Sequence, residues 1–351
     1  MQSRFWGDFK AEFGWKPLCL SVEAFPRAFQ LLLLIRRLPA GFSFAYVPHG
    51  PELELPEGER ASFLAELARS LKPLLPSRCL FIRFDPPWFR VEVPRADSAS
   101  DEEAIGKPDV KIDDLRPKIG RPLCRSAADV QVPDTVFVDL RPDEGLILAA
   151  MKPKWRYNIR LAEKKGVIVE EAGLESLSEF YELYKTTSAR DKIALHPEVY
   201  YRRLFALASE RRGKGVPASP DIRLWIARHE GKALAANITL FRGEKAVYLY
   251  GASSDEKRNL MPTYALQWKA MRAAKDAGCL EYDLFGMPPT SDPSHPMHGL
   301  YQFKTGFGGK VIHRSGSWDY PLSALAYALF RTAEAARTWW FKDFKKKLRR
   351  R

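Results

Sequence analysis

The chain has 351 residues, 46% of them hydrophobic and 12% aromatic, with a formal net charge of +13 and a pI of about 9.5. This length suits two domains of ordinary size, and the composition excludes a disordered or fibrous protein. The excess of positive charge favours a polyanionic partner, such as nucleic acid, a nucleotide-sugar phosphate or an anionic membrane surface. Solubility alone is the alternative explanation of the charge.

Cysteine and histidine patterns argue against a metal centre. The four cysteines are far apart and form no CxxC pair, and the six histidines contain no HExxH pattern. We therefore predict no disulfide framework, no metal and no cofactor. The N-terminal sequence has no apolar signal core, and the apolar run 31–35 is too short to span a bilayer. These features predict a soluble, cytoplasmic protein.

Hydrophobic periodicity predicts alternating helices and strands in the first part of the chain. The predicted elements are a short helix over 6–15, strands over 29–35 and 42–47, a helix over 60–75, and strands over 79–84 and 135–140. The stretch 94–132 is polar and rich in proline, which predicts irregular structure.

The second part continues with the same mixture of elements. The predicted elements are a basic helix over 151–166, helices over 174–187 and 197–211, strands over 223–228, 233–241 and 246–251, a helix over 262–277, and a strand over 280–284. Strand meanders followed by a helix and a strand favour an α/β fold with mixed sheets over a doubly wound parallel one.

Two segments share one order of features. LARSLKPLLPSRCLFIRFDPP in the first half and MRAAKDAGCLEYDLFGMPP in the second both read as amphipathic helix, break, short apolar strand, Asp and Pro-Pro. This echo suggests two structurally related domains. We predict domains at 1–150 and 151–320, followed by a basic amphipathic helix at 321–351.

Five segments together resemble the Fem family of peptidoglycan bridge-forming aminoacyltransferases. They are QSRFW with GWKP at 2–17, AYVPHGP at 45–51, IRFDP at 82–86, KWRYNIRLAEKKGV at 154–167 and LYQFKTGFGG at 300–309. The resemblance implies two tandem GNAT-like acyltransferase domains, aminoacyl-tRNA as donor, and UDP-MurNAc-pentapeptide or lipid II as acceptor. The short stretch 200–221 resembles the compact, FemX-like members, which lack a helical arm.

The resemblance also implies catalytic residues. Lys304 matches the functional lysine of the family, near the tRNA acceptor end, and Asp85 matches a residue that contacts the acceptor and helps to handle its amine proton. An aminoacyl ester is already activated, so the reaction needs no covalent nucleophile, and no Ser-His-Asp or Cys-His arrangement is evident. From the residues alone, Lys304 reads as a surface lysine in a strand that ends at a Gly-rich turn, and Asp85 as a turn residue.

Five further residues are implied to bind the substrates. Lys10 matches a basic residue proposed to hold the acceptor phosphate, and Phe303 offers an aromatic face to the terminal adenine or sugar. Tyr200 and Tyr250 match tyrosines of the same cleft, although core positions are the alternative. His196 stands where related compact members have an acceptor-binding arginine, which leaves a nucleotide-linked or a lipid-linked acceptor open.

Two basic segments predict macromolecular contacts. Lys154, Arg156 and Arg160 lie on the basic helix and suit tRNA phosphates; a solvated helix is the alternative. Aromatic residues followed by a basic cluster in 321–351 suit peripheral contact with the inner membrane leaflet. The alternatives for this segment are packing on the second domain or holding tRNA. We expect a monomer.

Two other functions compete with this interpretation. An acyl-CoA-dependent transferase of the GNAT fold would carry a Gly-rich loop before a helix, but the corresponding stretch 257–264 has no glycine, and Pro262 removes an N–H donor. The second competitor is a non-catalytic protein that binds tRNA or membrane.

Overall fold

The computed structural model describes residues 1–24, 27–92 and 115–339, and it divides into two compact units. Within these ranges the first unit contains Met1–Phe89, Arg116–Pro133 and the chain from Arg314 onward. The second unit contains Asp134–His313 and the segment that begins at Arg90. Most of the irregular stretch predicted at 94–132 lies outside the described residues.

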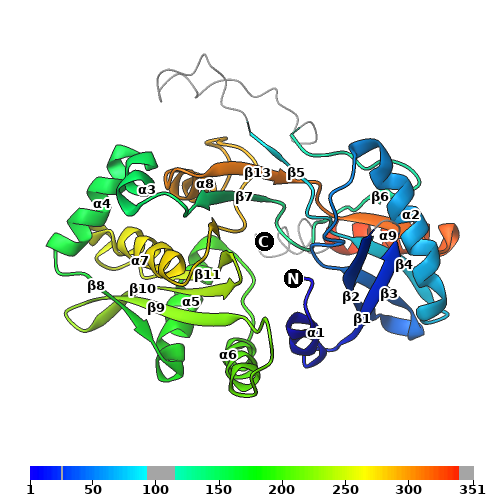
Figure 1. Cartoon of the computed structure of the whole chain (residues 1–351), viewed down its shortest axis with the longest axis horizontal. Coiled ribbons are helices and arrows are strands. Elements are labelled where there is room, and N and C mark those ends of the chain that lie inside the picture. The colour runs from blue at the N-terminus through cyan, green and yellow to red at the C-terminus, as the bar shows by residue number, and fades with distance from the viewer. Residues whose placement is uncertain (25–26, 93–114, 340–351) are drawn as a thin grey trace, which may run out of the picture. The chain divides into compact units, whose positions relative to one another are not determined.

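The first unit is built on a six-stranded sheet, of which β1 to β4 are drawn in blue in Figure 1. Its strands, in spatial order, are β1 (Trp15–Ala24), β2 (Arg27–Arg37), β3 (Ser43–Val47), β4 (Cys79–Phe84), β14 (Trp318–Pro321) and β6 (Cys124–Arg125). β3 and β4 are parallel and are connected through α2 (Arg60–Leu71), whereas β1, β2 and β3 form an antiparallel meander.

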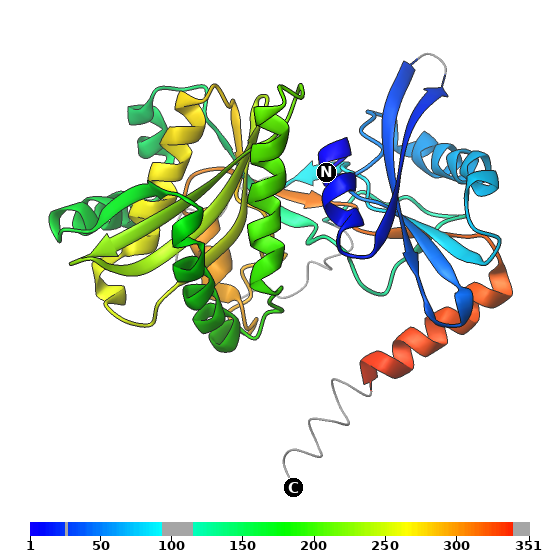
Figure 2. The ribbon, with the colours of Figure 1, turned by 90° about the horizontal axis from the view of Figure 1, so that it is seen from below.

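Side chains along β2 point alternately to the two faces of this sheet, and both faces are buried. Leu31, Leu33 and Ile35 pack with the apolar side of α2. Leu32 points to the opposite face and contacts Gly7 of α1 (Arg4–Ala11). The last described helix, α9 (Ala324–Trp339), also packs on the first unit, against β4 (Figure 2). The alternative prediction that this helix packs on the second domain is therefore wrong.

The predicted boundary at residue 150 differs from the observed division because of strand pairing. β7 (Asp134–Asp139) pairs with strands of the second unit, so the second unit begins before residue 150. β14 pairs with β4 and β6, so residues from 314 onward return to the first unit. The basic cluster that we predicted at the end of the 321–351 helix lies outside the described residues.

A buried ion pair joins β4, β14 and α9. Arg83 of β4 donates two hydrogen bonds to the carboxylate of Asp319, at 2.7 and 2.9 Å. The Tyr327 hydroxyl of α9 donates to the same carboxylate at 2.8 Å. Asp319 is fully buried, so its charge depends on these donors.

We expect Arg83→Met to lower the free energy of unfolding by about 3–5 kcal/mol, because it leaves the Asp319 carboxylate buried without its cation. Chemical denaturation measures this change. Arg141→Met is a matched control, since Arg141 forms an exposed ion pair with Asp139 and its loss should leave the midpoint unchanged. Equal midpoints for the two variants would contradict the proposed importance of the Asp319 cluster.

The second unit is built on an eight-stranded sheet. In spatial order the strands are β5 (Phe89–Val91), β13 (Lys310–Arg314), β7, β12 (Glu281–Asp283), β11 (Lys245–Ser253), β10 (Lys232–Arg242), β9 (Asp221–His229) and β8 (Ile168–Ala172). β11 and β12 are parallel and are connected through α7 (Pro262–Asp276).

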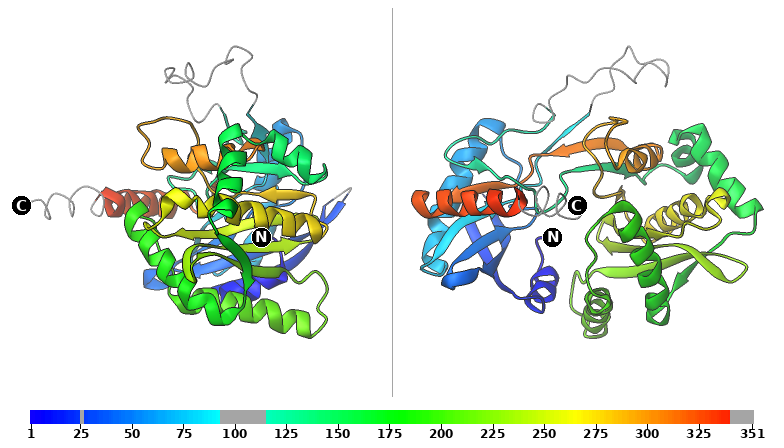
Figure 3. Two further views of the ribbon diagram at one scale, coloured as in Figure 1. Left: turned by 90° about the vertical axis from the view of Figure 1, so that its left-hand side faces the viewer. Right: turned by 180° about the vertical axis from the view of Figure 1, so that it is seen from behind.

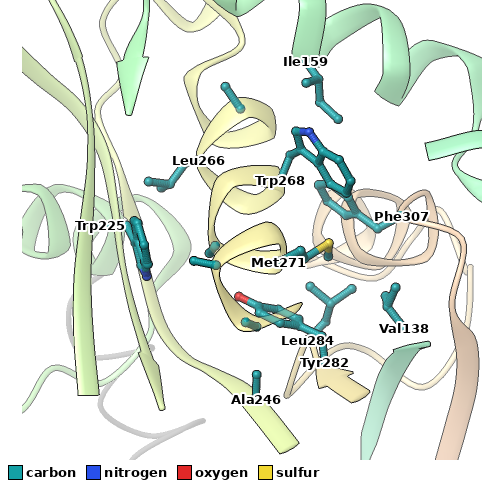
Figure 4. Close-up of a cluster of buried hydrophobic side chains, with 14 of the residues drawn as sticks. Val138, Ile159, Trp225, Ala246, Leu266, Trp268, Met271, Tyr282, Leu284 and Phe307 are labelled. Carbon is teal, nitrogen blue, oxygen red and sulfur yellow. The ribbon is translucent and has the colours of Figure 1, made fainter. Parts of the chain in front are cut away.

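Helices cover both faces of this sheet (Figure 3). α4 (Pro153–Lys164) and α7 pack together on one face, where Trp268 and Met271 of α7 meet Trp225 of β9 and Tyr282 of β12 in the main core (Figure 4). α5 (Leu177–Asp191) packs on β10 and β11, and α6 (Glu198–Gly213) packs on β9 and α5. The remaining helices are α3 (Glu144–Ala150) and α8 (His298–Thr305), and short 3-10 turns occur at Pro39–Gly41, Glu57–Glu59, Lys72–Leu74, Leu174–Ser176 and Arg258–Leu260.

The two units repeat one arrangement, as the echo in the sequence suggests. In each, an antiparallel hairpin (β2–β3 or β10–β11) is followed by a crossover helix and a strand parallel to the second strand of the hairpin. In both units an aspartate stands at the end of the last strand of this arrangement. Asp85 directly follows β4, and Asp283 is the last residue of β12. The predicted α/β fold with mixed sheets is confirmed.

Candidate functional site

Asp85 is a buried acid at the end of β4. Its side chain is 1% exposed and accepts a hydrogen bond from the Tyr46 hydroxyl at 2.9 Å. Backbone bonds fix the residue as well, because its N–H donates to the Val47 carbonyl and its carbonyl accepts from the Gly50 N–H. Burial raises the pKa of Asp85 to about 7, and the Tyr46 hydrogen bond offsets part of that rise. A carboxyl group with this pKa can gain or lose a proton near neutral pH.

The loop beside Asp85 is held by the second residue of the chain. The Gln2 side-chain amide donates to the Pro48 carbonyl at 2.7 Å, and its oxygen accepts from the Leu32 N–H at 2.6 Å. A Cβ on Gly50 would lie 2.6 Å from the Gln2 side chain, so a larger residue there would displace Gln2. The segments around Gln2 and Pro48 are therefore joined by hydrogen bonds beside Asp85.

His49 is a functional candidate that the sequence analysis missed. It lies in this loop with a φ of 45°, a left-handed conformation that is uncommon for histidine. Burial, followed by the positive charges of Arg314 and the chain's N-terminus, lowers the pKa of His49 well below its usual value. Arg314 also lowers the pKa of Asp85, so the two titratable groups share one charged neighbour. The segment AYVPHGP contained this histidine, but nothing in its spacing distinguished it.

Lys10 also belongs to the first unit. It is in the last turn of α1, with its ammonium 4.9 Å from the centre of the Trp6 ring. Burial and the nearby charge of Arg36 lower its pKa to about 8. Gln2, at the other end of α1, is the residue that reaches the loop beside Asp85.

Lys304 is buried in the second unit, on α8. It is 5% exposed, and its ammonium donates to the carbonyls of Leu284, Phe285 and Gly286 at 2.7, 2.9 and 2.7 Å. Burial lowers its pKa to about 7. Only the charged form has three N–H donors for these three carbonyls. The interpretation of Lys304 as a surface residue in a strand is therefore wrong.

Asp283 shapes the turn that receives Lys304. Its Oδ1 atom accepts from the Phe285 N–H at 2.7 Å and from the Thr135 hydroxyl at 2.5 Å. Phe285 has a φ of 55°, so this bond stabilises a backbone conformation that phenylalanine rarely adopts. The pairing of β11 with β12 ends at Val247 and Asp283, immediately before this turn. Asp283 thus orients the carbonyls that bind the lysine.

The segments at 154–167 and 300–309 pack directly on each other. The Trp155 indole N–H donates to the Phe303 carbonyl at 2.9 Å, and the Lys152 N–H donates to the Gly306 carbonyl. A Cβ on Gly306 would lie 2.1 Å from the Trp155 ring. The Phe303 ring packs at an angle against the rings of Tyr264 and Phe307. Trp155 and Gly306 therefore set the position of the helix that carries Lys304.

Gly306→Ala is expected to destabilise the protein by about 1–3 kcal/mol, because the new methyl group overlaps the Trp155 ring. Gly299→Ala is the matched control on the same helix, where a Cβ meets nothing within 4 Å. The control should be neutral or stabilise by about 0.5–1 kcal/mol through helix propensity. Thermal unfolding of both variants measures the difference, and similar melting temperatures would contradict the close packing.

Three predicted substrate-binding residues lie together in the second unit. The His196 and Tyr200 rings stack with their centres 4.1 Å apart, and Tyr200 shares a hydrogen bond with Tyr250. Tyr201 and Tyr184 pack around Tyr250 with ring centres at 5.1 and 6.3 Å. Tyr200 is 3% exposed, as the alternative of a core position expects, and its role in substrate binding stays a prediction. Burial raises the pKa of each of these tyrosines.

A β-bulge separates this aromatic cluster from Lys304. Tyr248 lies opposite Thr239 and Tyr250 lies opposite Ile238, so Leu249 is an extra residue in β11. Side chains two positions apart normally share a face, but the insertion turns Tyr248 toward the α7 face and Tyr250 toward the α5 face. The Lys304 ammonium lies 5.1 Å from the centre of the Tyr248 ring, on the α7 face.

The predicted tRNA-binding residues differ in their surroundings. Lys154 and Arg160 are exposed on α4, as is Tyr157, which is 62% exposed between them. Arg156 instead donates to the carbonyls of Ala149 and Met151, at the end of α3. Arg156 therefore connects α4 to the preceding helix.

A family model described as the FemAB family matches residues 1–210 and 225–335. The chain belongs to the FemAB family. A solved structure of FemX covers 94% of this chain and 94% of its own, with 21% identity and a TM-score of 0.71. This likeness shows that the chain shares the FemX fold, as the sequence resemblance implied.

Several proteins with similar sequences are named as lipid II:glycine glycyltransferases. A lipid II:glycine glycyltransferase of Staphylococcus saprophyticus is 25% identical over 56% of this chain and 60% of its own length. One of Staphylococcus aureus (strain USA300) is 22% identical over 94% of this chain and 89% of its own. The chain thus spans only about three-fifths of the length of the first of these FemAB relatives.

Proposed function

We propose that this FemAB protein is an aminoacyltransferase that moves an amino acid from aminoacyl-tRNA to the side-chain amine of a peptidoglycan stem peptide. The acceptor is UDP-MurNAc-pentapeptide or lipid II, and the product is an interpeptide bridge. Membership of the FemAB family, together with relatives named as lipid II:glycine glycyltransferases, supports the reaction class. We place the reaction in the cytoplasm.

The buried carboxyl group of Asp85 is the observation that carries the mechanism. A lysine-type amine has a pKa of about 10.4, so it must lose a proton before or during its attack on the ester carbonyl. Asp85, with a pKa of about 7, accepts that proton near neutral pH. The amine nitrogen forms the new amide bond, the ester C–O bond breaks, and the tRNA hydroxyl leaves with a proton.

We propose that Lys304 stabilises the charge that develops on the aminoacyl ester of the tRNA donor. Its three N–H groups are engaged by the carbonyls of the 284–286 turn, so it acts by fixing this turn and by placing positive charge there. Positive charge beside the ester stabilises the oxyanion that develops on its carbonyl oxygen. Phe303, one residue earlier on α8, offers its ring to the terminal adenosine.

The remaining predicted residues complete the proposed substrate contacts. His196, Tyr200 and Tyr250 form an aromatic surface for the acceptor, with His196 in place of the arginine of related members. Lys10 binds an acceptor phosphate, because its pKa, lowered to about 8, still leaves it mostly protonated at neutral pH. Lys154 and Arg160 contact tRNA phosphates, and Arg156 supports them through α3.

An acyl-CoA donor is the weaker alternative. The N-terminus of α7 would have to hold the CoA pyrophosphate, yet its first residue is Pro262, which has no N–H. The residue before it, Met261, provides no side-chain cap. This geometry counts against an acyl-CoA donor.

Transfer of radiolabelled amino acid from a mixed aminoacyl-tRNA pool tests the proposal. Acceptors would be UDP-MurNAc-pentapeptide and, separately, lipid II in detergent, with RNase-treated tRNA as the control. We expect label in one acceptor only when the tRNA is intact. A folded protein that transfers label to neither acceptor, but does transfer acetyl groups from acetyl-CoA, would overturn the assignment.

A further inference from the structure

One side of α9 is anchored to the first unit. Tyr327 and Phe330 pack against Phe81 of β4, with ring centres at 5.4 and 4.9 Å. The Tyr327 hydroxyl donates to the buried Asp319 carboxylate, and Arg331 donates to the Arg125 carbonyl. These contacts fix the rotation of the helix about its axis, and therefore decide which residues face outward.

The outward side of α9 carries no charge within the residues whose side chains are described. Leu325 is 75% exposed and Leu329 is 64% exposed, one turn apart. Arg331 and Glu334, the charged residues between 324 and 336, are both half-buried. The exposed residues of this stretch are Ala324, Leu325, Ala328, Leu329, Thr332, Ala333, Ala335 and Ala336.

Thr332 does not interrupt the apolar character of this side. Its hydroxyl donates to the carbonyls of Ala328 and Leu329 within the helix, at 2.8 and 2.9 Å. The hydrogen-bonding capacity of the hydroxyl is therefore used inside the helix. Up to Ala336 the exposed face is made of Ala, Leu and Thr, which is unusual in water, where a surface helix normally presents charged residues.

We propose that this outer face of α9 docks on an anionic membrane surface. The sequence that follows the helix supplies the complementary charge, because seven of the last ten residues are Lys or Arg. Trp340, Phe341 and Phe344 precede or accompany them, and aromatic residues favour the membrane interface. None of the described helices is both long and apolar enough to cross a bilayer, so α9 lies on the surface.

Charge argues against a second copy of the chain as the occupant. Each chain carries a net charge of +13, and two such chains repel each other when their basic ends approach. A surface of anionic lipids instead attracts the same cations, by an amount that grows with their number. This inference is independent of the proposed function, because it uses no catalytic residue.

Co-sedimentation of the full chain with vesicles tests the proposal. Vesicles of phosphatidylcholine alone are compared with vesicles that also contain phosphatidylglycerol. We expect the wild type to bind the anionic vesicles and Leu325→Ser/Leu329→Ser to bind at least about tenfold more weakly. Leu146→Ser is the matched control, since Leu146 is 60% exposed on α3 and its loss should change nothing. Circular dichroism establishes that each variant is folded.

A second variant tests the electrostatic part. Replacing Lys345, Lys346 and Lys347 together by Gln should weaken binding to anionic vesicles by about a hundredfold at low salt. If the leucine variant bound anionic vesicles as tightly as the wild type does, the outer face of α9 would not be the docking surface. The proposal would also be overturned if the wild type did not bind vesicles but formed a dimer, and if the leucine variant did not dimerise. This result would show that a second copy of the chain covers α9.

Discussion

Replacing Asp85 by asparagine is expected to lower turnover by about 10²–10⁴-fold, the usual contribution of a general base, while it makes the protein more stable at pH 8. Asparagine keeps an oxygen for the Tyr46 hydroxyl and has nearly the same shape, so the fold around it should persist. Loss of activity with a gain in stability is the expected signature of a group maintained for chemistry. Steady-state transfer kinetics and urea denaturation measure the two effects.

The stability effect depends on pH in a defined direction. Burial raises the pKa of Asp85 from 3.8 to about 7, so the folded chain binds more protons than the unfolded chain between these values. Stability contributed by the protonated acid is therefore lost as the pH rises from 4 to 7, by about 4 kcal/mol in total. Asp85→Asn removes this dependence, so its advantage over the wild type should grow through that window and then level off.

A matched acid provides the control. Asp139 is exposed and paired with Arg141, which lowers the pKa of Asp139 to about 2. Asp139→Asn should leave transfer activity unchanged and should not stabilise the protein at pH 8. If Asp85→Asn retained full activity, Asp85 would not be the base, whatever its effect on stability.

Lys304→Met is expected to reduce transfer by about 10²–10³-fold, comparable to the loss of one preorganised electrostatic contact at a reacting centre. Lys304→Arg should not rescue it, because a planar guanidinium cannot direct three donors from a single nitrogen to the converging carbonyls of Leu284, Phe285 and Gly286. The turn that holds these carbonyls should loosen in both variants. Faster thermolysin cleavage near Phe285 would report this loosening independently of activity.

The control for this variant is a lysine on the neighbouring helix α7. Lys269 is exposed, and Lys269→Met should leave both transfer and cleavage unchanged. Full activity in Lys304→Arg would show that positive charge alone is sufficient and would contradict a specific role for the three carbonyls. The pH dependence distinguishes these outcomes further, because the lowered pKa of Lys304, about 7, exists only in the wild type.

Strong periodicity made much of the fold predictable from the sequence. The β4 strand was predicted to the residue, and the helix predicted over 60–75 begins where α2 does, because Leu64, Leu67 and Leu71 recur on one helix face. The α-helix ends four residues earlier than predicted, at Leu71, and a 3-10 turn follows it. The strand β1 was missed, since Lys16, Pro17 and Ser21 interrupt its apolar pattern. β14 was missed for another reason: it has four residues, and its pairing with β4 depends on contacts more than two hundred positions apart.

The candidate site was only partly predictable. Asp85 at the end of an apolar strand was correctly placed, because an acid after a buried strand lies at the edge of the sheet. Lys304 was placed in a strand, since the apolar residues around it suited either element, and its burial depends on three carbonyls from a turn eighteen or more positions away. The opposite orientations of Tyr248 and Tyr250 could not be foreseen, because a single inserted residue reverses the alternation.

The route of the chain through the first unit has a consequence for biosynthesis. The chain leaves this unit after Pro133 and returns at Arg314, and β14 then inserts between β4 and β6. While the ribosome synthesises the intervening residues, Arg83 has no Asp319 to pair with, and β4 has an open edge. The first unit, although its synthesis begins first, is therefore the last to be completed. A stop codon shortly before Trp318 would leave Asp134–His313 intact and deprive the N-terminal sheet of its missing strand.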